Sequence, residues 1–67
     1  MTYEEARRIF NLKAKDTINL ESTKRLLEHN QRVLKGYLSD SLRKDFELET
    51  EALEILIAYE EKKNEVE

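Results

Sequence analysis

The sequence of 67 residues contains no cysteine, no proline, no tryptophan and a single glycine. Without cysteine the chain can form no disulfide bond, has no thiolate nucleophile and lacks the usual cysteine-containing zinc sites. Its longest apolar run, residues 55–59, is far shorter than the roughly 20 residues of a membrane-spanning helix. Residues 1–9 are polar and charged, unlike the apolar stretch of a signal peptide. We therefore expect a cytoplasmic protein that is not associated with a membrane.

A chain of 67 residues buries only about 60% of the surface that its unfolded form exposes, which predicts one core and a single domain over residues 1–67. Charged residues make up 40% and hydrophobic residues 39%, whereas residues that favour strands and turns are scarce. This composition predicts an all-α fold, a small three-helix bundle with a short first helix and two longer ones. We expect helices over 2–11, 20–35 and 40–63, and a frayed tail at 64–67.

Local signals set these boundaries. Thr2 and Glu5 form the Thr-x-x-Glu pattern of a capping box, in which the hydroxyl accepts a hydrogen bond from a free backbone N–H. Asn11 is suited to end the first helix because asparagine tolerates the left-handed backbone conformation. Asn19 is a favourable N-cap for the second helix, and Gly36 stands where that helix should end.

Charge is distributed unevenly along the chain. Residues 1–44 carry ten Lys/Arg and six Asp/Glu, whereas residues 45–67 carry two Lys and nine Asp/Glu. The formal net charge of −3 therefore conceals a basic first part and an acidic third helix.

Five glutamates of the third helix define what we call the acidic edge. Their spacing of i, i+4, i+7, i+14 and i+18 places them along one side of the helix: Glu47, Glu51, Glu54, Glu61 and Glu65. This edge is either a solvated surface that keeps the chain soluble or a row of carboxylates that contacts a basic groove. In the second case we expect Glu47, Glu51, Glu54 and Glu61 to make electrostatic contacts, with Ile57 and Tyr59 as apolar anchors.

Two polar residues interrupt the apolar stripes of the longer helices. Asn30 lies in the middle of the stripe of the second helix, and Glu49 lies near the middle of the apolar arc of the third. Because an unpaired buried carboxylate costs several kcal/mol, we expect Glu49 to have a partner. An Asn30–Glu49 hydrogen bond would satisfy both residues and fix the register of the helices. Alternatively, Glu49 is an interface residue that meets an Arg or Lys of another molecule.

A second charged group surrounds the loop after the first helix. It comprises the basic residues Arg7, Arg8, Lys13, Lys15, Lys24 and Arg25, which could contact nucleic acid. The isoelectric point near 5.2 argues against this function. So do the aromatic residues, because all of them lie on inferred core faces: Tyr3, Phe10, Tyr37, Phe46 and Tyr59. The simpler interpretation is that the basic first part complements the acidic third helix within the molecule.

The sequence offers no constellation for catalysis or metal binding. His29 is the only histidine and projects away from the apolar stripe, so we expect a surface residue. Glycine-rich phosphate loops, the His-Glu-x-x-His pattern and EF-hand spacing do not occur. We expect no enzymatic activity, no metal ion and no cofactor.

Both ends of the chain carry a recurrent pattern. The opening residues 1–9, with Thr2-Tyr3-Glu4-Glu5-Ala6, and the later stretch 51–57, with Glu-Ala-Leu-Glu-Ile-Leu-Ile, resemble small uncharacterised helical proteins of phages and prophages of Gram-positive bacteria. The resemblance implies an accessory protein that inhibits or adapts host machinery.

Together these observations predict a non-enzymatic module that binds and modulates a host protein through the acidic helix. Nucleic-acid-handling and defence proteins are the partner classes that the resemblance and the charge favour. Two alternatives remain open: a small nucleic-acid-binding protein that uses the basic residues, and a structural homo-oligomer.

Overall fold

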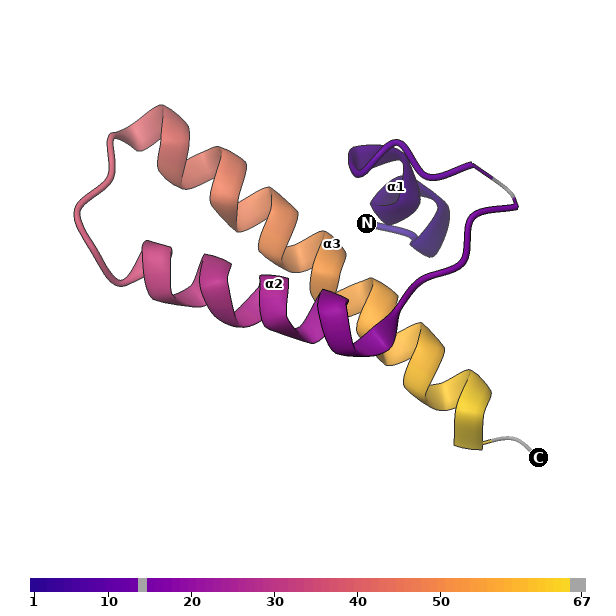
Figure 1. Cartoon of the computed structure of the whole chain (residues 1–67). Coiled ribbons are helices and arrows are strands. Elements are labelled where there is room, and N and C mark those ends of the chain that lie inside the picture. Colours follow the sequence, from indigo (N-terminus) through magenta and orange to yellow (C-terminus); the bar gives the residue numbers. More distant parts are fainter. Residues whose placement is uncertain (14, 66–67) are drawn as a thin grey trace.

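The computed structural model describes residues 1–13 and 15–65, and these form three α-helices (Figure 1). They are α1 (Tyr3–Ile9), α2 (Leu20–Leu34) and α3 (Asp40–Glu65). The described residues include no strand, so the prediction of an all-α, three-helix fold with a short first helix is confirmed.

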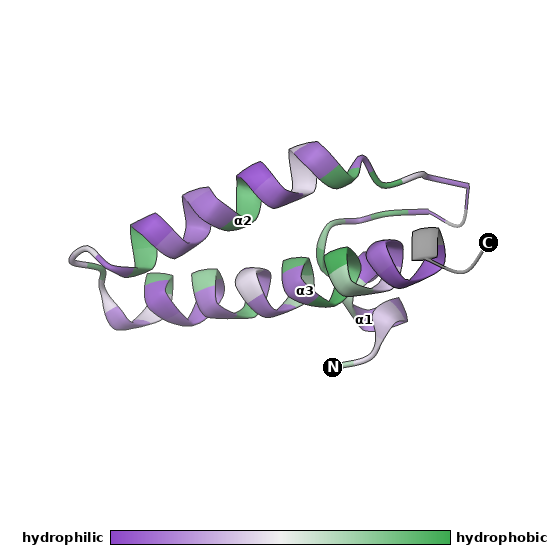
Figure 2. Ribbon diagram, turned by 90° about the horizontal axis from the view of Figure 1, so that it is seen from below, coloured by the Kyte–Doolittle hydropathy of each residue, from purple (hydrophilic) through white to green (hydrophobic). Residues whose placement is uncertain are grey.

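The helix α3 is the centre of the structure. The helices α2 and α3 form an antiparallel hairpin, and α1 packs against α3 from another side (Figure 2). Figure 1 looks nearly along α1 while α2 and α3 lie across the view, so α1 crosses α3 instead of running beside it. Within the described ranges α1 and α2 do not pack against each other. The result is an elongated molecule measuring 42 × 19 × 17 Å.

The predicted caps determine where the first two helices begin. The Thr2 hydroxyl accepts a hydrogen bond from the Glu5 backbone N–H at 3.2 Å, and Asn19 Oδ1 accepts one from the Ser22 N–H at 2.9 Å. After α1, Asn11 has a φ of 55°, in the left-handed region expected for it. These local predictions are confirmed.

The helix ends differ from the predicted ranges by small amounts. The first helix covers 3–9 and not 2–11, because Thr2 is its cap and the chain already turns at Phe10. The second ends at Leu34, one residue early. The third continues to Glu65, two residues beyond the predicted end at 63, and Lys62 and Lys63 in its last turn complement the helix dipole. Residues 66–67 of the expected tail lie outside the described residues.

An arginine, and not a left-handed glycine, completes the end of α2. The Arg43 guanidinium donates to the backbone oxygen of Leu34 at 3.0 Å and to that of Gly36 at 3.2 Å. Gly36 itself has no positive φ. Because the last carbonyl groups of a helix lack partners within it, Arg43 supplies donors that α2 needs.

The core lies where α1 crosses α3. Ala6 and Ala52 are both 0% exposed, and these two small side chains let the helices approach closely. Leu53, Leu56 and Ile57 of α3 are also buried. Ala6, Ala52 and Leu56 form one buried cluster, and partly buried apolar residues pack against it: Tyr3, Ile9, Phe10, Leu12, Ile18 and Ile55. In the described part of α2 the only fully buried residue is the polar Asn30.

We expect Ala52→Leu to lower the free energy of unfolding by about 1–3 kcal/mol, because three added carbons have no space between α1 and α3. Ala58→Leu is the matched control, since Ala58 is an exposed alanine of the same helix and leucine is also a good helix former. Urea unfolding followed by circular dichroism measures both variants. Equal midpoints for the two would show that α1 does not pack closely on Ala52.

The left-handed residue Asn11 allows a second test. Alanine at this position should lower the free energy of unfolding by about 1 kcal/mol, because its Cβ is strained at positive φ, whereas Asn11→Gly should be tolerated. The same urea titration distinguishes them. If Asn11→Ala were as stable as Asn11→Gly, α1 would end in another conformation.

Candidate functional site

The part of the acidic edge nearest the turn lies on a side of α3 that the other helices leave uncovered. The side chains of Glu47, Glu51 and Glu54 are exposed, and no described lysine or arginine lies within ion-pair distance of them. Glu61 is exposed as well, but its Oε2 lies 3.5 Å from the Lys24 Nζ of α2. The side chain of Glu65 lies outside the described residues. The structure thus keeps the first three carboxylates together and free of internal partners.

The two expected apolar anchors lie in different environments. Ile57 is only 7% exposed and belongs to the core, so it offers no surface for a partner, and the expectation for it is wrong. Its helical position is covered because α3 packs against two helices and buries a wide arc. Tyr59 is 47% exposed and stacks on Tyr3, with ring centroids 3.9 Å apart and an interplanar angle of 17°. Its role as an anchor stays a prediction.

Arg7 connects α1 to the following loop. Its guanidinium donates to the Tyr3 hydroxyl at 3.1 Å, to the Asp16 backbone oxygen at 3.0 Å and to the backbone oxygen of Lys13. The same loop is closed by the Lys13 N–H, which donates to the Asp16 carboxylate at 2.7 Å. Arg7 therefore holds the loop in place and has few donors left for a ligand.

The other predicted basic residues do not act as one patch. Lys24 pairs with Glu61, and Arg25 pairs with Glu21 at 2.7 Å. Arg8, Lys13 and Lys15 are exposed. We expected the basic first part to form ion pairs with the acidic helix, and the Lys24–Glu61 pair is one such contact. Its side chains are about half exposed, so the pair contributes at most about 1 kcal/mol to the free energy of unfolding.

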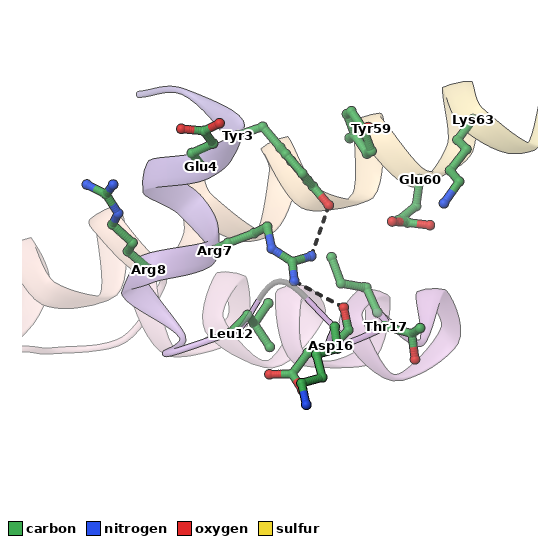
Figure 3. Close-up of a pocket in the computed structure, with 12 residues that line it drawn as sticks. Tyr3, Glu4, Arg7, Arg8, Leu12, Asp16, Thr17, Tyr59, Glu60 and Lys63 are labelled. Carbon is green, nitrogen blue, oxygen red and sulfur yellow. Dashed lines mark hydrogen bonds between the residues drawn. The ribbon is translucent and has the colours of Figure 1, made fainter.

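A shallow hollow of about 730 Å³ lies between α1, the loop and the last turns of α3 (Figure 3). Arg7 points into it beside Tyr3, whereas Arg8 points away. Its lining includes cations and anions side by side: Arg7, Arg8, Lys15 and Lys63 with Glu4, Asp16 and Glu60. Because charges of both signs line it, the hollow favours no ligand of one sign.

The predicted contact between Asn30 and Glu49 is present. Asn30 is 1% exposed, and its Nδ2 donates to Glu49 Oε2 across the α2–α3 hairpin at 3.5 Å, which is long for a hydrogen bond. Glu49 keeps partial exposure. The pair satisfies the amide in the hairpin, while the alternative role of Glu49 in an interface stays a prediction.

Three features differ from the sequence interpretation or were missed by it. Tyr37 at 99% and Tyr59 at 47% are exposed and do not lie in the core as expected. For Tyr37 the reason is that α2 ends before it, so helical periodicity no longer applies. The i, i+4 spacing of Tyr3 and Arg7 could have indicated their contact. No signal in the sequence could have shown that Arg7 and Arg43 bind distant backbone oxygens. His29 is exposed, as expected.

Comparisons with other proteins assign no family to this chain: no family model, no curated protein and no solved structure matches it significantly. No helix among the described residues is both long enough and apolar enough to cross a membrane. Over 1–13 and 15–65, no group of three or more His, Cys, Asp or Glu side chains is placed to hold a metal ion.

The role of Arg7 can be tested by conservative substitution. Arg7→Lys should lower the free energy of unfolding by about 1–2 kcal/mol, because an ammonium group cannot reach a hydroxyl and two carbonyl oxygens with the geometry of a guanidinium. Arg8→Lys, at the adjacent exposed arginine, should leave stability unchanged. Urea unfolding measures both, and equal loss in the two variants would mean that the loop contacts of Arg7 contribute nothing.

Proposed function

We propose that this chain is a non-enzymatic protein-binding module whose acidic edge binds a basic surface of another protein. The observation that carries the proposal is the exposure of Glu47, Glu51 and Glu54 on one side of α3, without a described cation in ion-pair distance. These residues were expected to make such contacts, and their side chains are accessible in this fold.

Electrostatics favours an external cation at this edge. Glu51 lies four residues after Glu47 and three before Glu54, so like charges are neighbours on the helix and destabilise it by a few tenths of a kcal/mol per pair. A lysine or arginine of a partner would replace this repulsion by attraction. Since α3 is helical throughout this region, binding would require no ordering of the backbone.

The length of the edge suggests the shape of the partner. With a rise of about 1.5 Å per residue, Glu47 and Glu54 are about 10 Å apart along the helix axis, and Glu61 lies about another 10 Å further. A groove lined with lysine and arginine fits such a row, and grooves of this kind include those that hold nucleic acid. The resemblance of the chain's ends to phage proteins makes a bacterial host protein the first partner to seek.

The decisive variant is E47Q/E51Q/E54Q, which removes three charges without changing side-chain size. Immobilised wild-type and variant chains are incubated with a lysate of a Gram-positive bacterium, and retained proteins are quantified by mass spectrometry. We expect the wild type to retain basic proteins that the variant loses. This retention should fall as salt is raised from about 0.05 M to 0.5 M, because screening shortens the range of exposed charges.

A matched control is E28Q/H29K/Q31K, which changes the net charge by the same amount at exposed residues of α2. It should retain the same proteins as the wild type. Retention by E47Q/E51Q/E54Q that equals the wild type would refute the proposal. Equal loss in both variants would show that net charge, and not the acidic edge, governs binding.

A further inference from the structure

The end of the α2–α3 hairpin that contains the connecting turn has no buried core. We call residues 31–49 the turn end. None of its side chains is fully buried, although seven are large and apolar: Val33, Leu34, Tyr37, Leu38, Leu42, Phe46 and Leu48. The most exposed are Tyr37 at 99%, Leu42 at 49% and Leu48 at 46%.

The arrangement of the helices explains this exposure. Every fully buried apolar residue of α3 lies between Ala52 and Ile57, where α1 and the loop after it also pack. Closer to the turn, α3 has only α2 beside it (Figure 2). Two helices share a single interface, so the apolar residues at its flanks stay in contact with water.

The surface area shows how much is left uncovered. The molecule exposes 5368 Å², whereas a compact monomer of 8.0 kDa exposes about 4,450 Å². The excess of about 900 Å² is close to the roughly 800 Å² that each partner contributes to a standard protein interface. Of the six large apolar side chains that are exposed among the described residues, Tyr37, Leu42 and Leu48 lie at the turn end, and Tyr37 is the most exposed of all.

Charge indicates which partner suits this surface. The turn end contains four Lys/Arg and four Asp/Glu, so it is formally neutral, unlike the acidic residues that follow it. Two identical neutral surfaces meet without net repulsion, and a two-fold contact places the same apolar residues against each other. The turn end as a whole, Glu47 included, therefore has no net charge that would favour a strongly basic or a strongly acidic partner.

We propose that the turn end is a self-association surface, through which two copies of this chain form a dimer. The two α2–α3 hairpins pack as a four-helix arrangement, and Leu42 and Leu48 of one copy are covered by the turn end of the other. Tyr37 of each copy loses its exposure to water in the contact. Glu51 and Glu54 of the acidic edge lie outside the turn end and stay accessible, whereas Glu47 belongs to both surfaces.

The test is the mass of the full chain in solution, measured by size-exclusion chromatography with light scattering from about 10 μM to 1 mM. The wild type should have about twice the monomer mass of 8.0 kDa at the higher concentrations. Leu48→Glu should be monomeric throughout. Leu26→Glu is the matched control at a leucine of similar exposure, 41% against 46%, outside the turn end, and it should remain dimeric.

A second variant, Tyr37→Ser, tests whether loss of the dimer could result from unfolding of the chain. Because Tyr37 is 99% exposed, its replacement removes no packing within one chain, so circular dichroism should be unchanged while dimerisation weakens at least tenfold. A monomeric wild type at 1 mM would overturn the proposal, as would equal dissociation of Leu48→Glu and Leu26→Glu. E51Q/E54Q, which changes no residue of the turn end, should keep the dimer mass, and this result separates the proposal from the binding function of the acidic edge.

Discussion

The buried cluster that joins Ala6 of α1 to Ala52 and Leu56 of α3 is the constraint on which the rest of the structure depends. The Ala6 and Ala52 side chains are both 0% exposed, and their small size leaves room for α1 to pack on α3. With α1 in this position, Arg7 donates a hydrogen bond to the backbone of the loop that follows α1. That loop ends at Asn19, the N-cap of α2. The opposite flank of α3 remains for α2, which is joined to it by the Asn30–Glu49 contact. A helix in the middle of the fold must therefore bury two faces and expose a third.

Two arginines compensate for what the sequence lacks. With no proline and one glycine, the chain has few residues that turn the backbone by their own conformation. Arg7 binds the backbone oxygens of the first connection, and Arg43 binds those of the second. A guanidinium group suits this task because its donors lie in a fixed planar array and can serve two carbonyl groups at once. Side-chain hydrogen bonds thus stabilise both turns.

The sequence was sufficient for features that depend on neighbouring residues. Thr2, Asn11 and Asn19 marked helix ends because caps act within a few residues, and helical periodicity placed Glu47, Glu51 and Glu54 on an exposed side. Asn30 and Glu49 could be paired across the hairpin because each interrupts an apolar stripe. Features that depend on how the helices pack together could not be predicted from the sequence. Nothing local shows that α1 crosses α3, that Ile57 is covered, or that Tyr37 lies past the end of α2.

The chemistry of the uncovered faces decides how they can associate. Two acidic edges repel each other, so the edge cannot mediate self-association and requires a cationic partner. The neutral, apolar turn end can instead pack against a second copy of itself. If two copies pair through their turn ends, the dimer carries two acidic edges, because the edge continues past the turn end to Glu61. A basic surface long enough to reach both would be held at two points, and the second contact would form at the high effective concentration set by the first. Weak exposed ion pairs on each α3 could then add up to stable binding.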